Sequence, residues 1–176
     1  MIVEGLLIAM VSYGAYRMMR YQARARRYLE QSGDERPLEM DHLEPALARL
    51  LQSTRSLRLN LEGTARLAEE LQKTDLMRTQ DDIESASREL MDASRDVTSW
   101  LQDIDNLSER LREQLGDMGV SPEPVRAAMN SEGWSFDLRR LKKAKGRESL
   151  DRRIRGIIGQ LATIETAMQT SRRVYR

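Results

Sequence analysis

Residues 83–115 read IESASRELMDASRDVTSWLQDIDNLSERLREQL, and apolar or small side chains recur in them every three or four residues. An average step of 3.5 residues places such side chains on one face of an α-helix, as in a coiled coil. We call this face the 83–111 seam; it comprises Ile83, Ala86, Leu90, Ala93, Val97, Trp100, Ile104, Leu107 and Leu111. The stretch therefore predicts a long amphipathic helix that packs against another helix.

A similar seam comes earlier in the chain. Asp41 and Glu44 have the spacing of a capping box, and Pro45 suits the first turn, so the sequence predicts a helix start here. The 43–71 seam comprises Leu43, Leu47, Leu50, Thr54, Leu57, Leu61, Thr64, Ala68 and Leu71. No Gly or Pro separates the two seams. Residues 41–116 are therefore predicted to form either an antiparallel helical hairpin or one continuous helix.

Glycines and prolines between residues 116 and 124 end this region. They predict a loop with one short helix over residues 117–136, followed by a basic amphipathic helix over residues 137–176. The 150–168 seam of that helix comprises Leu150, Ile154, Ile157, Leu161, Ile164 and Met168. Gly156 and Gly159 each lower helix stability by about 1 kcal/mol relative to Ala. We therefore expect a neighbouring segment to approach them closely.

The N-terminal residues, MIVEGLLIAMVSYGAYRMMRYQARARR, form an apolar run that ends in arginines. A hydrocarbon core of about 30 Å needs roughly 20 helical residues, which residues 1–19 approach if arginine side chains reach the headgroups. We predict a transmembrane anchor over residues 1–30 and a linker over 31–40. A secretory signal, an interfacial helix and an ordinary core helix are the alternatives.

The arginines follow the apolar run, which predicts an extracellular N-terminus and a cytoplasmic C-terminal domain in the cell membrane. Small residues on one face of the predicted span suggest helix packing within the membrane: Gly5, Ala9 and Ser12. The residues expected at the membrane–water interface are Tyr13, Tyr16, Arg17, Arg20, Tyr21 and Arg24. These features favour a subunit of a membrane assembly.

The composition favours an all-α fold. The 176 residues include one Phe, two Trp and five Tyr, and 32% of them are charged. No segment shows the alternating β-branched pattern of a strand. We expect a single transmembrane helix, then a long helical hairpin or coiled coil, then a C-terminal amphipathic helix.

Charge is balanced overall, at a net +1, but not along the chain. Residues 75–117 hold 12 acids and 5 bases, whereas residues 136–176 hold 12 bases and 4 acids. This asymmetry predicts that the acidic and basic helices pair. Alternatively, a basic and aromatic cluster within 134–147 binds an anionic lipid surface: Trp134, Phe136, Arg139, Arg140, Lys142, Lys143 and Lys145.

Features of catalysis are scarce. The chain has no Cys and one His, and it contains neither phosphate-binding glycine motif. Glu39 and His42 have the spacing of di-iron bundles, but one chain lacks the second copy and the further glutamates of such a site. We therefore expect no enzyme activity, no cofactor, no metal and no small-molecule substrate.

The sequence thus predicts a non-enzymatic, membrane-anchored helical scaffold or accessory subunit of a membrane protein complex. The seams would dock other subunits or a second copy on the cytoplasmic side. The first alternative is a peripheral protein that binds the membrane surface through residues 134–147. The second is a soluble helical bundle that binds nucleic acid, which is disfavoured because no recognition module accompanies the basic cluster.

Overall fold

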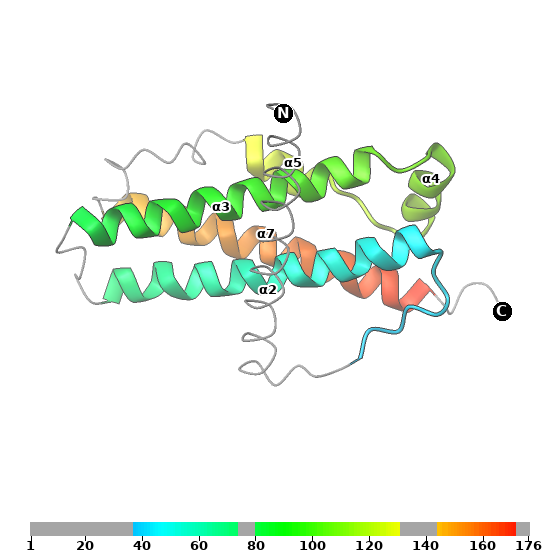
Figure 1. Cartoon of the computed structure of the whole chain (residues 1–176), viewed down its shortest axis with the longest axis horizontal. Coiled ribbons are helices and arrows are strands. Elements are labelled where there is room, and N and C mark those ends of the chain that lie inside the picture. Colours follow the sequence, from blue (N-terminus) through cyan, green and yellow to red (C-terminus); the bar gives the residue numbers. More distant parts are fainter. Residues whose placement is uncertain (1–36, 74–79, 131–143, 172–176) are drawn as a thin grey trace, which may run out of the picture. The chain divides into compact units, whose positions relative to one another are not determined.

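The computed structural model describes residues 37–73, 80–130 and 144–171, and every regular element within them is a helix (Figure 1). The elements are α2 (Pro45–Lys73), α3 (Gln80–Asp105), α4 (Glu109–Asp117), α5 (Glu123–Asn130) and α7 (Ala144–Thr170). The prediction of an all-α chain is confirmed for these residues.

The prediction of a single-pass membrane protein is contradicted. Across the described ranges, no helix combines the length and the apolar character needed to cross a bilayer. α2, α3 and α7 are long enough, with 29, 26 and 27 residues, but all three carry charged side chains along their length. Residues 1–30, where we predicted the anchor and its packing and interface residues, lie outside the described residues.

α2 and α3 form a hairpin and not a continuous helix. They run side by side in opposite directions (Figure 1), and the indole of Trp100 on α3 donates a hydrogen bond to Thr54 on α2. In one straight helix, a separation of 46 residues would place these side chains about 70 Å apart. The contact therefore excludes the rod.

The helix that begins with the 83–111 seam stops before the seam does. α3 ends at Asp105 and α4 begins at Glu109, so Leu107 lies in a non-helical break over residues 106–108. Asn106 and Ser108 favour such breaks because their side chains compete for backbone hydrogen bonds. The helix restarts when the amides of Leu111 and Arg112 donate to the Ser108 carbonyl, each at 3.0 Å.

The C-terminal part contains the predicted short helix, α5, and the basic helix, α7. The amide of Arg126 donates to the Pro122 carbonyl at 3.0 Å, so the prolines lie at the start of α5, where Pro is tolerated. We predicted the basic helix to begin at residue 137; the described part of it begins at Ala144, and residues 137–143 lie outside the described residues. α7 packs most extensively against α2 and also contacts α5.

The apolar side chains of α2, α3 and α7 form one core, with α4 and α5 packed against it. The three predicted seams supply most of this core, and their burial accounts for the helix arrangement. The buried seam residues are Leu43, Leu47, Leu50, Thr54, Leu57, Leu61, Thr64, Leu90, Ala93, Val97, Trp100, Ile104, Leu111, Leu150, Ile154, Ile157, Leu161, Ile164 and Met168. Leu107 is partly buried, and the side chains of Leu71 and Ile83 lie outside what the structure describes.

Candidate functional site

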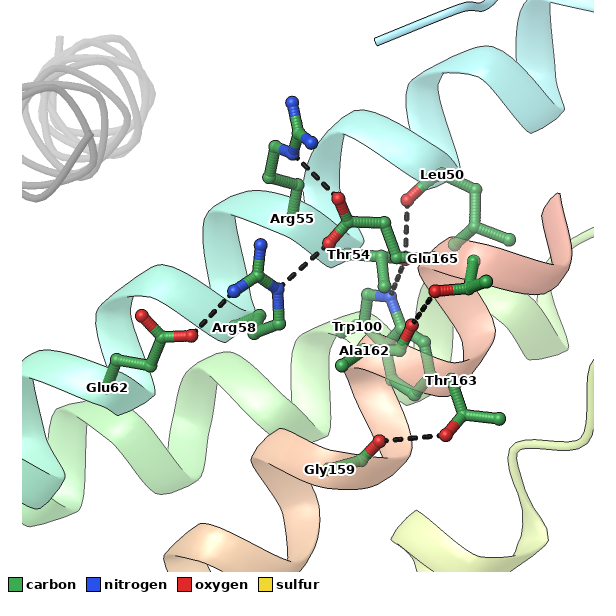
Figure 2. Close-up of polar contacts among 11 residues, drawn as sticks. Leu50, Thr54, Arg55, Arg58, Glu62, Trp100, Gly159, Ala162, Thr163 and Glu165 are labelled. Atoms are coloured by element: carbon green, nitrogen blue, oxygen red, sulfur yellow. Dashed lines mark hydrogen bonds and ion pairs between the residues drawn. The ribbon is translucent and has the colours of Figure 1, made fainter. Parts of the chain in front are cut away.

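Charged side chains meet in the middle of the bundle, where α2 faces α7 (Figure 2). Glu165 of α7 accepts a hydrogen bond on Oε1 from Nε of Arg55, at 2.7 Å, and another on Oε2 from Nε of Arg58, at 2.9 Å. The Glu165 side chain is 7% exposed and each arginine side chain is 12% exposed. We call these three residues the α2–α7 joint.

Arg58 also connects the joint to its own helix. Its Nη1 donates to Oε1 of Glu62, one turn away, at 2.6 Å. Burial alone would lower the pKa of Arg58, but the hydrogen bonds and charges of Glu165 and Glu62 outweigh burial and raise it. A raised pKa means that Arg58 stays charged at all pH values below its ordinary range. The stability that this shift represents is lost as the pH rises through the raised pKa, and the ion pairs also require their carboxylates to be ionised.

A second polar contact joins α2 to α3. Nε1 of Trp100 donates to Oγ1 of Thr54 at 3.0 Å, and the same hydroxyl donates to the Leu50 carbonyl at 2.7 Å (Figure 2). Thr54 is fully buried in the 43–71 seam. Its hydroxyl is therefore tolerated because it has both a donor and an acceptor in the core.

The chemistry of the joint favours structure over catalysis. A guanidinium is not deprotonated at physiological pH, so neither arginine can act as a general base or nucleophile. Both oxygens of Glu165 are engaged by arginines on the neighbouring helix. What the arrangement does well is to fix the axial position of α7 against α2, because two forked donors one turn apart hold one carboxylate.

The outward-facing side of α7 carries no charge between Gly156 and Thr170. Its exposed residues are Gly156, Gly159, Gln160, Thr163, Thr166 and Thr170. The hydroxyls of Thr163 and Thr166 donate to carbonyls of their own helix, at 3.0 and 2.9 Å. We call these six residues the uncharged face of α7.

The two α7 glycines have no close neighbour among the described residues. A Cβ built at Gly156 or Gly159 would meet no heavy atom within 4 Å. Both positions are exposed in the described part of the chain. The expectation that a neighbour approaches them closely stays a prediction.

Exposed ion pairs hold the two short helices. Nη2 of Arg110 on α4 lies 2.6 and 2.7 Å from the two carboxylate oxygens of Glu44, the residue before α2. Nη2 of Arg126 on α5 donates to Asp105 at the end of α3, at 2.8 Å, and this hydrogen bond raises the pKa of Arg126.

On α7, Arg155 reaches Glu69 of α2 at 3.1 Å, and its contacts with Asp151 raise the pKa of Arg155.

The single histidine also joins two segments. Nε2 of His42 lies 3.1 Å from the carbonyl of Met168, in the last turn of α7. The ring thus donates to one of the carbonyls that a helix C-terminus leaves unpaired. Within the described ranges, no group of three or more His, Cys, Asp or Glu residues could hold a metal ion.

The predicted lipid-binding cluster cannot be placed. Trp134, Phe136, Arg139, Arg140, Lys142 and Lys143 lie outside the described residues, and Lys145 belongs to α7 with its side chain outside them. The N-terminal sites, Gly5 through Arg24, are outside them as well. The ion pairs described for α7 join it to α2 and not to the acidic stretch 75–117, so the predicted pairing of the acidic and basic stretches stays a prediction.

The α2–α7 joint was not predicted from the sequence. A signal was present: Glu165 directly follows the seam residue Ile164, and Arg55 and Arg58 flank the 43–71 seam at a spacing of three. Charges beside a seam are the usual partners across a helix pair. The sequence alone does not say which of the many flanking charges are buried.

Comparison with protein families, with curated proteins and with solved structures finds no match for this chain.

Proposed function

We propose that the chain is a non-enzymatic helical scaffold or accessory subunit of a protein complex, and that it docks another protein through the uncharged face of α7. The observation that carries the proposal is that this face is exposed and uncharged in a chain with 32% charged residues. Solvent-exposed helix faces in such a chain are ordinarily charged. A partner helix could approach here without burying an unpaired charge.

The two glycines support the same proposal. Each lowers the stability of α7 by about 1 kcal/mol relative to Ala, and no neighbour among the described residues requires a small residue. A partner backbone that approaches closely would benefit from their missing side chains. The seam residues are less suited to docking, since they are buried in the chain's own core.

The α2–α7 joint supports the scaffold part of the proposal. It fixes α7 relative to α2, so the outer face of α7 is presented in one defined position. A preformed surface loses less conformational freedom on binding than a mobile one. The partner is a second copy of the chain or another subunit of the complex.

A charge placed in the uncharged face tests the proposal. Thr163→Arg should abolish recovery of a stoichiometric partner by affinity purification, or dissociate a homo-oligomer in light scattering. Thr98→Arg on α3 is the matched control, because Thr98 is also exposed and also donates to its own helix at 3.0 Å. If Thr163→Arg and Thr98→Arg behave like the unmodified chain, docking through this face is wrong.

A further inference from the structure

α4 is a short helix with a break before it and a turn after it. It has nine residues, Glu109–Asp117, and the non-helical residues 106–108 separate it from α3. Isolated helices shorter than about 12 residues are marginal in water. α4 is therefore helical because it is docked, and its docking contacts decide whether it stays so.

The contacts that dock α4 are few. Leu111 and Leu115 are its buried side chains, Val120 is buried just after it, and Leu107 and Met118 pack partly buried on either side of it. The ion pair between Arg110 and Glu44 adds a polar contact. That pair is weakly protected from water, since the Arg110 side chain is 75% exposed and that of Glu44 is 41% exposed. Extensive helix packing connects α2 with α7, α2 with α3 and α5 with α7, but α4 makes no comparable contact.

The two ends of α4 differ in how they are held. At its C-terminal end, the amide of Val120 donates to the Leu115 carbonyl and that of Gly119 to the Gly116 carbonyl, each at 2.9 Å. With Gly119 at a φ of +78°, this is a Schellman motif, which closes the helix firmly. At the N-terminal end, the Ser108 side chain makes no capping hydrogen bond. The weaker end is the break at 106–108.

We propose that α4 is a latch: residues 106–120 detach from the bundle as one unit, while the packing of α2, α3 and α7 stays intact. Opening exposes Leu111, Leu115 and Val120 and breaks the Arg110–Glu44 pair. Small cooperative units of this kind open more often than the whole protein unfolds. The proposal is independent of docking through the uncharged face of α7.

Amide hydrogen exchange on the full chain, under conditions where closing outpaces exchange, tests the latch. We expect the amides of α4 to exchange at least about 10-fold faster than the slowest amides of α2, with a weaker dependence on urea. Equal rates and equal urea dependence would mean that α4 opens only when the whole protein unfolds, and they would overturn the proposal.

A core variant far from α4 gives the sharper result. Ile157 is buried on α7, two residues from Arg155, which pairs with Glu69 in the C-terminal part of α2. The α4 ion pair lies at the other end of α2, because Glu44 directly precedes its N-terminus. Ile157→Val should speed exchange in α2 by about 2- to 10-fold through lower global stability. It should leave α4 unchanged within 2-fold, because Ile157 stays buried when α4 opens. An equal acceleration in α4 would overturn the latch.

A variant within α4 excludes simple fraying. Leu115 is buried when α4 is docked and exposed in both the open and the unfolded states, so Leu115→Ala should speed exchange in α4 and α2 by the same factor, about 30-fold or more. If that variant does not fold, Leu115→Val should do the same with about 4-fold acceleration. Acceleration in α2 without acceleration in α4 would mean that α4 exchanges with Leu115 still buried, against the proposal.

Discussion

The middle of the bundle and its α4 end are both held by arginine–carboxylate pairs, but in very different surroundings. The α2–α7 joint is largely removed from water, with side chains 7–12% exposed, whereas the Arg110–Glu44 pair is largely exposed. Distances in the two regions are similar, between 2.6 and 2.9 Å. The distance between the charged atoms therefore does not determine how much each pair contributes to stability; exposure to solvent does. Water screens exposed charges, whereas a buried charge that loses its partner is costly.

Removing the carboxylate of the joint should have the largest effect. Glu165→Ala leaves two largely desolvated arginines without their shared partner, and breaking a buried pair costs several kcal/mol. We expect a loss of about 3 kcal/mol in the free energy of unfolding, at the lower end of that range, because Arg58 keeps Glu62. Urea denaturation followed by far-ultraviolet circular dichroism measures it.

The matched control is on the same arginine. Glu62→Gln removes the helical neighbour of Arg58 but leaves Glu165 in place, and such pairs contribute about 0.5 kcal/mol. A loss for Glu165→Ala no larger than that for Glu62→Gln would show that the joint is not desolvated in solution, and the contrast between the two regions would disappear.

Replacing Thr54 should come next. Thr54→Val keeps the shape of the side chain but leaves Nε1 of Trp100 buried without an acceptor, at a cost of about 1–3 kcal/mol. Urea denaturation followed by tryptophan fluorescence reports both stability and the indole environment. Thr98→Val, at an exposed position, should change stability by less than about 0.5 kcal/mol. Equal stabilities of the two variants would contradict a role for the Trp100–Thr54 bond.

Much of the middle region could be predicted from sequence, because burial follows periodicity. The heptad spacing of Leu47, Leu90 and Ile154 identified helices and their inner faces. The same periodicity also led to an error: it continues through Leu107 and Leu111, so it gave no sign of the break that creates α4. The break lies at Asn106 and Ser108, residue types that are unfavourable within helices, although the Ser108 side chain makes no capping hydrogen bond here.

The polar joint and the location of the chain were less predictable. Composition shows many arginines and glutamates, but which of them are buried depends on how α7 aligns with α2, a long-range property. The membrane prediction relied on the apolar run at residues 1–19, yet hydropathy does not distinguish a marginal span from an apolar segment with another role. The absence of any spanning helix in the described ranges contradicts it.

Two glycines at the α4 end should respond in opposite directions. Gly119 has a φ of +78°, a conformation that costs an L-residue about 1–2 kcal/mol, so Gly119→Ala should destabilise. Gly116 lies within α4 and a Cβ there meets nothing within 4 Å, so Gly116→Ala should stabilise by about 0.5–1 kcal/mol. Urea denaturation measures both, and a shift in the same direction for the two variants would contradict the Schellman motif.

The smallest effect should belong to the exposed pair at the α4 end. A double-mutant cycle with Glu44→Gln and Arg110→Gln isolates the coupling between the two side chains, and exposed pairs give about 0.2–1 kcal/mol. Salt should reduce this coupling, because the Debye length falls from about 30 Å at 0.01 M to about 3 Å at 1 M. The same cycle on Arg55 and Glu165 should keep most of its coupling in salt, since both side chains are shielded from the solution. If the coupling between Glu44 and Arg110 equals that between Arg55 and Glu165 and also resists salt, α4 closes over its ion pair. The charges at the α4 end would then be as shielded from water as those of the α2–α7 joint.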